Sequence, residues 1–214
     1  MIAILTGDIV DSRKLESPEI WILPLKSLFS TWGSSPKTWE IFRGDSFQLE
    51  ISEPQNSLLA TLQIKALMKS LANSDQSKRT SPVDVRLAIG IGEKTYTSDQ
   101  ITESNGPAFI RSGERFETLK SEGNQLAVAS PWPDFDREIN LILRLASIQM
   151  DSWSISSGEL LIEILKNPAR NQTELGRLLG IGQNAISKRF KAANVAEIAD
   201  MEAIFRAKLN SCLK

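Results

Sequence analysis

The sequence of 214 residues contains no histidine and only one cysteine, Cys212. The absence of histidine excludes Ser-His-Asp and Cys-His catalysis, histidine-ligated metals and the usual general base. One cysteine cannot form an intramolecular disulfide, and it cannot build a zinc site from several thiolates. Several familiar nucleophilic and zinc-dependent enzyme classes are therefore excluded.

Long apolar runs are absent as well. No segment approaches the length of about 20 residues that a membrane-spanning helix requires. Residues 1–13, MIAILTGDIVDSR, are apolar for only a few positions and then turn acidic, so we expect a first β-strand rather than a signal peptide. We therefore expect a cytoplasmic protein with no membrane partner, because a single cysteine suits that reducing compartment.

The charge is unevenly distributed, although the net charge is only −1. Residues 155–214 carry nine Lys and Arg against six Asp and Glu, a net charge of +3, whereas residues 1–154 carry 16 against 20, a net charge of −4. A mildly basic C-terminal region beside an acidic remainder is typical of a protein that contacts DNA with one end only. The field is weak, so we do not expect tight non-specific binding by a monomer.

Residues 171–193, NQTELGRLLGIGQNAISKRFKAA, have the pattern of a helix-turn-helix. Asn171 and Glu174 have the spacing of a capping box, which starts a helix. Gly180 falls where the chain must turn sharply, and glycine accepts a positive φ there without steric conflict. The apolar residues predicted to face inward are Leu175, Leu178 and Leu179 of the first helix, and Ile181, Ile186 and Phe190 of the second.

The open face of the predicted second helix carries amide, hydroxyl and ammonium groups. Such groups contact base edges and phosphates in the major groove of DNA. The predicted partner is therefore double-stranded DNA, and the alternative is an ordinary pair of amphipathic helices in a protein-interaction bundle. The residues predicted to contact DNA are Gln183, Asn184, Ser187, Lys188 and Lys191.

Residues 1–130 alternate between strand and helix patterns. The order predicts an α+β domain with a split βαβ sheet of the ferredoxin-like kind, extended by one helix and one strand. A polar loop is expected over 73–82. Strands are expected over 2–7, 39–42, 47–51, 83–91 and 125–129, and helices over 17–30, 55–73 (amphipathic) and 106–120.

The Ser-Pro-Trp-Pro sequence at 130–133 marks a domain boundary, so we expect an all-helical domain over 134–214. Helix-turn-helix proteins usually bind DNA as symmetric dimers, because one recognition helix buries little surface. We therefore expect a homodimer, with the sheet or the helix over 135–152 as the contact. The other predicted elements are a helix that Ser156 and Glu159 cap and that ends near Asn167, and a closing helix over 195–210.

Two aspartates are predicted to meet at one edge of the sheet. Asp8 ends the first strand, Asp45 lies in the hairpin between the second and third, and a ferredoxin-like sheet pairs the first strand beside that hairpin. Two close carboxylates repel unless a cation lies between them, and Mg²⁺ prefers oxygen ligands. We expect a Mg²⁺ or Mn²⁺ site at Asp8 and Asp45, with Asp11 available as a third ligand. The alternative is that both aspartates are turn residues.

The segments GDIVDSR at 7–13, RGDSFQLEI at 43–51 and VRLAIGIGE at 85–93 resemble class III nucleotidyl cyclases and their diguanylate-cyclase relatives. In those families two aspartates at these places bind two metal ions that orient a nucleotide triphosphate. By resemblance, Asp8 and Asp45 match the two aspartates, and the backbone of Ile9 matches an accessory carbonyl ligand.

The chain as a whole resembles the SatD family of bacterial proteins, in its opening strand, its RGDSFQ hairpin, the segment GPAFIRSGERFETLK at 106–120 and its terminal helix-turn-helix. This resemblance spans nearly all of the chain, and it implies architecture more than activity.

The sequence departs from active cyclases at three places. Such cyclases carry an asparagine and an arginine on the helix after the VRLAIGIG-like strand, whereas residues 106–117 offer Arg111 and Arg115 but no asparagine at the matching place. Ile41 replaces the lysine that reads the purine, and Ser46 replaces the acidic neighbour that diguanylate cyclases have beside the hairpin aspartate. The resemblance therefore implies metal and phosphate binding without implying cyclase turnover.

The leading hypothesis is a DNA-binding regulatory protein whose N-terminal domain senses a nucleotide or mediates assembly. The rival hypothesis is an enzyme, a Mg²⁺-dependent nucleotidyl transferase or cyclase with the helical domain as an accessory module. In that case Asp8 and Asp45 hold the metal, and the phosphate-binding residues are Arg43, Arg111 and Arg115.

Overall fold

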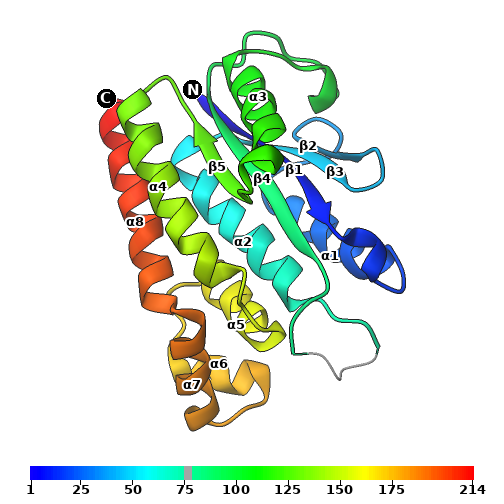
Figure 1. Ribbon diagram of the computed structural model, residues 1–214, viewed down its shortest axis with the longest axis vertical. Helices are drawn as coiled ribbons and strands as arrows, with labels where there is room; N and C mark the ends of the chain where they lie inside the picture. The colour runs from blue at the N-terminus through cyan, green and yellow to red at the C-terminus, as the bar shows by residue number, and fades with distance from the viewer. Residues whose placement is uncertain (75–78) are drawn as a thin grey trace.

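A five-stranded mixed sheet with its helices forms the N-terminal part of the chain, and an all-helical region of five helices follows it (Figure 1). The computed structural model describes residues 1–74 and 79–214. The α+β class predicted from the sequence is confirmed. Of the loop predicted over 73–82, residues 75–78 lie outside the described residues.

The strands lie in the order β2-β3-β1-β4-β5. The central strand β1 pairs antiparallel with β3 and with β4, β2 pairs antiparallel with β3, and β5 runs parallel to β4. All five predicted strands are confirmed to within a few residues. Their bounds are Ile2–Val10 for β1, Trp39–Phe42 for β2, Ser46–Ile51 for β3, Asp84–Gly92 for β4 and Leu126–Ala129 for β5.

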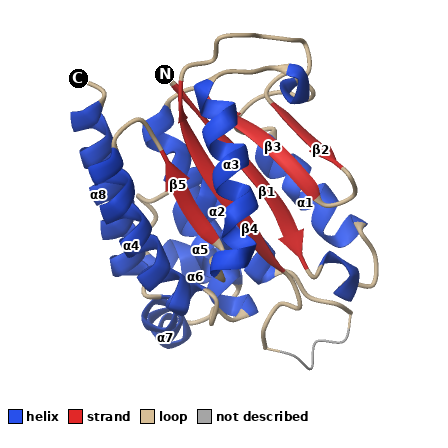
Figure 2. Cartoon of the chain, turned by 45° about the horizontal axis from the view of Figure 1, so that its top comes forward, coloured by secondary structure: helices blue, strands red, loops and turns tan. Residues whose placement is uncertain are grey.

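Alternation along β1 gives the sheet two different faces. Leu5 and Ile9 belong to the largest apolar cluster of the molecule, which we call the main core. Ile4, the neighbour of Leu5 along the strand, packs instead with Ala108 and Phe109 of α3 (Pro107–Glu122). Figure 2 shows α3 in front of the sheet, whereas α1 (Glu19–Phe29) and α2 (Ser57–Ser70) lie behind it.

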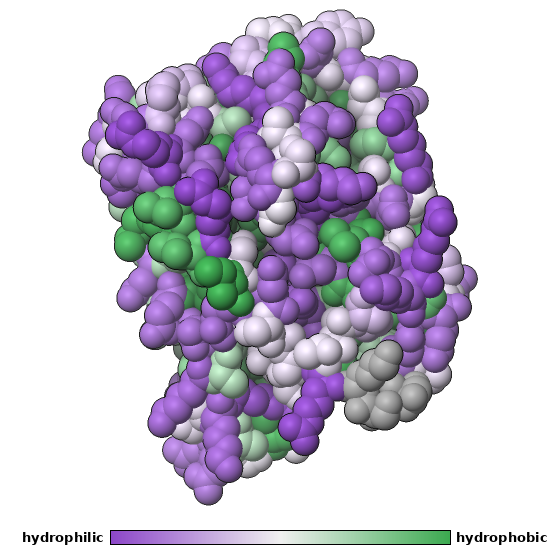
Figure 3. Space-filling model, viewed as in Figure 1, coloured by the Kyte–Doolittle hydropathy of each residue, from purple (hydrophilic) through white to green (hydrophobic). Residues whose placement is uncertain are grey.

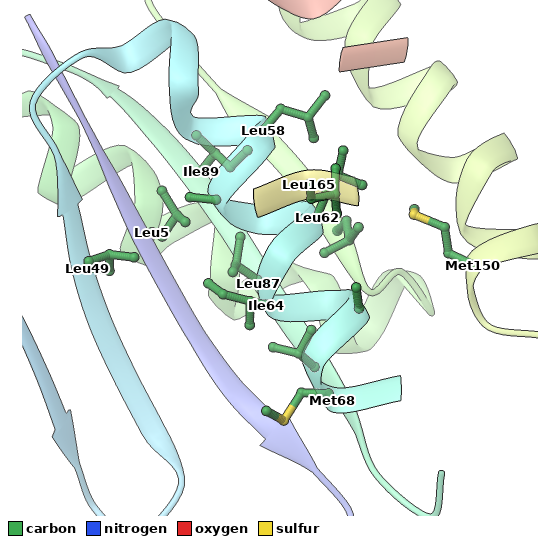
Figure 4. Packing of buried hydrophobic residues seen from close by; sticks show 14 of the residues in the cluster. Leu5, Leu49, Leu58, Leu62, Ile64, Met68, Leu87, Ile89, Met150 and Leu165 are labelled. Carbon is green, nitrogen blue, oxygen red and sulfur yellow. The ribbon is translucent and has the colours of Figure 1, made fainter. Parts of the chain in front are cut away.

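Helix α2 is buried on almost all sides, so the prediction of an amphipathic helix over 55–73 was wrong about its surroundings. One side packs on the sheet, and the other packs on α5 (Ile155–Lys166). Figure 4 shows Ile64 beside the sheet residue Leu87, and Leu62 beside Leu165 of α5. The polar positions that suggested a solvent face are covered because the C-terminal helices pack over them.

A buried charge network accompanies this burial. The ammonium group of Lys65 is fully buried and lies 2.7 Å from a carboxylate oxygen of Asp84 and 2.6 Å from one of Asp151. The ammonium of Lys69 lies 2.9 Å from the second oxygen of Asp84 and donates to the Asp151 carbonyl at 2.8 Å. The network therefore joins α2, β4 and Asp151, the residue that follows α4 (Pro133–Met150).

The C-terminal helices add to the same main core. Phe135 of α4, Leu161 of α5 and Phe205 of α8 all belong to it, and α4 and α8 run side by side in Figures 1 and 2. Among the described residues, no helix has the length and hydropathy needed to cross a membrane. The remaining bounds are Pro133–Met150 for α4, Gln172–Leu179 for α6, Gln183–Ala193 for α7 and Val195–Cys212 for α8.

The N-cap of α5 is Ser154 and not the predicted Ser156. Ser154 has an extended backbone, and its hydroxyl accepts from the backbone N–H of Ser157 at 3.1 Å. Ile155 is already helical, so the next two serines lie inside the first turn. Three serines within four positions offer the same capping chemistry, and the backbone conformation decides between them.

Candidate functional site

The segment 171–193 forms the short helices α6 and α7. Asn171 and Glu174 form the predicted capping box: each side chain accepts from the other residue's backbone N–H at 3.0 Å. Gly180 ends α6 with a φ of 66°, as its position in the sequence predicted. The backbone N–H of Ile181 then donates to the Gly176 carbonyl at 2.9 Å, which closes the turn before α7.

A small separate apolar cluster fixes α7 against α5 and α6. Leu160, Leu175 and Ile186 are fully buried in it, and Leu179, Ile181 and Phe190 pack around them. The prediction that Leu178 faces inward was wrong, because this side chain is 53% exposed. The inward stripe of α6 passes through Gly176, where an added Cβ would meet the Ile181 carbonyl at 2.9 Å, and Leu178 lies to the side of that stripe.

The outer face of α7 carries the residues predicted to contact DNA. Gln183, Asn184, Lys188 and Lys191 are exposed, and Ser187 is half-buried. Among residues 1–74 and 79–214 neither lysine forms an ion pair, whereas the neighbouring cation Arg189 lies 3.1 Å from Glu159 of α5. Both ammonium groups on this face are therefore available to anions, while the third cation of the helix is held by α5.

A hollow of about 380 Å³ lies beside this face, between the starts of α6 and α7. Its polar lining includes Gln172, Thr173 and Arg177, which the sequence analysis did not single out. Nothing in the sequence indicated that these three residues of the first helix belong to the site, since they share no periodic pattern with the second helix. They adjoin Gln183 only because the turn at Gly180 brings the two helix starts together.

The structure brings Asp8 and Asp45 to the same end of the sheet. Asp8 is directly opposite Ser46 of β3, and the Asp45 carbonyl accepts from the backbone N–H of Ile9 at 3.1 Å. Each carboxylate has a protein partner of its own. The Asp8 carboxylate forms an ion pair with Arg86 of β4, and the Asp45 carboxylate accepts from the Ser12 hydroxyl at 3.0 Å.

These residues fit a divalent cation only after Arg86 is displaced. One oxygen of Asp8, Oδ1, is buried and has no hydrogen-bond partner among the described residues, which is the kind of atom that a cation would satisfy. The other oxygen already faces a guanidinium. Asp11, offered by the sequence as a third ligand, instead lies 2.7 Å from the ammonium of Lys14. Within the described parts of the chain, no group of three or more acidic, histidine or cysteine side chains is suited to a metal ion.

Arg86 is a site residue that the sequence analysis missed. It is the register partner of Asp8, and its guanidinium lies 5.6 Å from the centre of the Phe116 ring, a cation–π contact. An arginine inside the apolar strand VDVRLAIGI was the available signal. Its meaning depended on the register between β1 and β4, which no local pattern gives.

A cavity of about 460 Å³ adjoins this cluster, on the face of the sheet where α3 lies. Of the three arginines predicted to bind phosphate, Arg43 alone lines it, at a hairpin position with a φ of 50°. The lining combines residues of the strands and of the hairpin with Thr102 and two residues of α3: Thr6, Gly7, Glu40, Phe42, Arg43, Ser46, Gln48, Thr102, Phe116 and Glu117.

Arg111 lies toward the opposite end of the sheet. Its guanidinium donates to the Ile91 carbonyl at 3.0 Å, and Ile91 pairs with Ala3. Ala3 is five residues from Asp8 along β1, which is about 17 Å at about 3.3 Å per residue. The structure therefore separates Arg111 from the two aspartates.

Arg115 is held by an acidic partner on its own helix. Its guanidinium binds Glu122 through two hydrogen bonds, and these bonds lower the pKa of that carboxyl to about 2. Burial raises the pKa of Asp136. The hydrogen bonds from Ser130 and the positive charges of Arg111 and Arg115 lower it, but the effect of burial is larger. The two arginines of α3 thus act on acidic groups outside the cavity that Arg43 lines.

Two surfaces therefore gather most of the predicted site residues. One is the outer face of α7 with its free amides and ammonium groups, and the other is the cavity beside the Asp8–Arg86 pair. In comparisons with known proteins, no protein-family model and no curated protein sequence matches this chain.

Proposed function

We propose that the protein is a cytoplasmic DNA-binding regulatory protein in which α6 and α7 form a helix-turn-helix. The observation that carries the proposal is the division of α7 into two faces. Ile186 anchors the inner face in the small apolar cluster, while the outer face presents exposed amides and two ammonium groups without ion-pair partners among the described residues. A helix of this kind suits the major groove of double-stranded DNA.

The proposed roles follow from side-chain chemistry. Gln183 and Asn184 present amides that can pair with base edges, and Ser187 adds a hydroxyl at the margin of the face. Lys188 and Lys191 then contact phosphates on either side of the groove. Net charge favours this end of the molecule, because residues 155–214 carry +3 and the remainder −4.

We propose a homodimer joined through α4. Leu141, Leu145 and Ile148 form an apolar stripe at helical spacing, and they are 50%, 61% and 74% exposed. Figure 3 shows hydrophobic side chains gathered on the left of the view, where α4 and α8 lie. A second copy packed on this stripe would bury its apolar side chains. It would also supply a second recognition helix, and a DNA site made of two half-sites requires one such helix for each half.

For the N-terminal part we propose a ferredoxin-like, cyclase-like unit of the SatD type, with β5 as the added strand. The strand order, with β1 between β3 and β4, supports this assignment. Its proposed ligand is a nucleotide in the cavity beside Asp8, where Arg43 would meet the phosphates. Arg111 and Arg115 have other partners, so the geometry favours a sensor over an enzyme.

The second candidate function is a Mg²⁺-dependent nucleotidyl transferase or cyclase, and the unpartnered Oδ1 of Asp8 is the observation in its favour. Replacing Arg86 with glutamine should give Asp8 and Asp45 a new affinity for Mn²⁺, because the competing guanidinium is gone. At a Mn²⁺ concentration about ten times the Kd, the variant should gain about 1.4 kcal/mol of stability, and thermal melts with and without the metal measure it. The wild-type gain should be clearly smaller.

The control carries Asp8→Asn in addition to Arg86→Gln, and the Mn²⁺ increment should disappear from it. Equal increments in the wild type and in the Arg86→Gln variant would show that the guanidinium does not compete with a metal. The wild type could instead turn over ATP or GTP in a reaction that requires the metal and is lost in Asp45→Asn. That result would overturn the sensor proposal in favour of the enzyme.

DNA binding is tested with Lys188→Ala combined with Lys191→Ala. Fluorescence anisotropy with a labelled duplex should show weaker binding at low salt than for the wild type. The slope of log K against log salt should fall by about 2, because two phosphate contacts are lost.

The mass from light scattering of the wild type should be twice 23.7 kDa if the α4 stripe joins two copies.

The matched control carries Lys37→Ala and Lys120→Ala, two exposed lysines on the N-terminal part. It changes the net charge by the same amount and should leave both the affinity and the salt slope near the wild-type values. If the two double variants weaken binding equally, net charge and not the outer face of α7 accounts for the effect.

A further inference from the structure

A wedge lies between α1, α2 and α5. Its volume is about 360 Å³, which is within the range of small-molecule sites. Leu28 of α1, Leu67 of α2 and Ile162 of α5 supply apolar walls, and Pro24 adds its ring from inside α1. At about 30 Å³ per water molecule, this space suits a ligand of about a dozen non-hydrogen atoms.

Gln63 is the buried polar side chain in the lining, at 8% exposed, whereas Ser27 and Thr31, which also line the wedge, are exposed. Each end of the Gln63 amide already forms a hydrogen bond within the protein. Its oxygen accepts from the Trp32 indole at 3.0 Å, and its nitrogen donates to the Leu165 carbonyl at 3.0 Å. A polar group placed in the interior would lose hydrogen bonds to water and would meet mainly the apolar walls, so the interior suits a hydrocarbon body.

The rim carries a cation that is only loosely held. Lys166 lines the wedge, its ammonium lies 3.2 Å from a carboxylate oxygen of Glu163, and its side chain is 52% exposed. Arg170 holds the same carboxylate more closely, at 2.6 Å. Since Glu163 keeps Arg170 as a partner when Lys166 turns away, the ammonium is free to meet an anionic head group at the mouth of the wedge.

We propose that this wedge is a binding site for a small amphipathic carboxylate. The hydrocarbon body would lie between α1, α2 and α5, and the carboxylate would pair with Lys166. A free nucleotide does not fit this chemistry, because it would place a polar base and a phosphate between the apolar walls and against an amide that is already bonded to the protein.

The position of the wedge connects it to the proposed recognition helix. Ile162 lines the wedge, and Leu160, two residues earlier on α5, packs with Leu175 of α6 and Ile186 of α7. A ligand that shifts α5 therefore acts on the support of α7, and DNA affinity would change with it. This coupling rests on the proposed function, whereas binding of the carboxylate does not.

Octanoate is the probe, with octylammonium as a control of equal chain length and opposite charge. Calorimetric titration of the full chain should show saturable binding of octanoate below its micelle concentration, and no comparable binding of octylammonium. Lys166→Gln should weaken octanoate binding about tenfold, because one charge-assisted contact is lost. Lys120→Gln removes a distant exposed lysine and should leave the affinity unchanged.

Ile162→Trp fills the wedge and should abolish binding, with circular dichroism and a melt to establish that the variant folds. The proposal is overturned if octanoate does not bind, if octylammonium binds equally well, or if Lys166→Gln binds octanoate as the wild type does. A wild-type protein that binds octanoate but does not bind DNA would overturn the proposed function and would leave this binding site supported. Octanoate binding that leaves DNA affinity unchanged would remove the coupling alone.

Discussion

Replacing Asp84 with alanine should lower the free energy of unfolding by about 3–5 kcal/mol, which is the usual effect of removing one partner of a buried ion pair. The carboxylate of Asp84 faces two ammonium groups, and Lys65 is fully buried while Lys69 is nearly so. Without it, both cations depend on Asp151, whose side chain is 45% exposed. In a chain of this size the melting temperature should fall by about 10 °C.

The control is Asp134→Ala, which removes the carboxylate of an ion pair whose side chains are 85% and 78% exposed. Exposed pairs contribute little, so this change should remain within about 1 kcal/mol. Adding Lys65→Met and Lys69→Met to Asp84→Ala should restore part of the loss, because no buried cation then lacks a partner. Denaturant titration of all three proteins measures these differences. An Asp84→Ala protein as stable as the Asp134→Ala protein would contradict the network.

Replacing Gly158 with alanine should lower the free energy of unfolding by about 3 kcal/mol, at the upper end of the usual effect of overpacking. An added Cβ would lie 2.6 Å from the backbone nitrogen of Ser70 and 2.7 Å from the Ala66 carbonyl. Both atoms belong to the backbone of α2 and cannot rotate aside. Helices α5 and α2 would have to separate, and apolar contacts of the main core between them would be lost.

Gly113 provides the matched control, because it also lies inside a helix, but an added Cβ there would have no described heavy atom within 4 Å beyond its own helix backbone and chain neighbours. Gly113→Ala should therefore raise stability by about 0.5–1 kcal/mol, as alanine favours the helix. The two substitutions are chemically identical and should change the denaturation midpoint in opposite directions. A shift of the same sign in both would mean that α5 can adjust to the extra methyl group.

The elements of the fold were largely predictable from local patterns. The strand segments around Leu5 and Leu87 are short apolar runs with turn residues beside them, and the capping box at Asn171 fixes a helix start by chemistry within four residues. Helix α2 was harder. Its polar residues Lys65 and Lys69 predicted a solvent face, and only the carboxylates of β4 and α4 make their burial tolerable. Such partners are distant in the sequence and cannot be read from the helix itself.

The candidate site was predictable to a similar degree. The outer face of α7 follows from helical periodicity, so the exposure of Asn184 and Lys188 agrees with the pattern. The surroundings of Asp8 depend on strand register, and the ion pair with Arg86 appears only when β1 and β4 are aligned. Arg111 was assigned to the same place by family resemblance, but its position along α3 directs it to the Ile91 carbonyl.

The single cysteine now gains a practical use. Cys212 is the last residue of α8, a helix of 18 residues that begins just after α7 and extends about 26 Å away from it (Figure 1). A fluorophore attached to this native thiol would therefore report on tumbling without touching the face proposed to meet DNA. In a two-copy assembly each subunit would carry one such reporter, and energy transfer between them would read the distance between the two α8 ends.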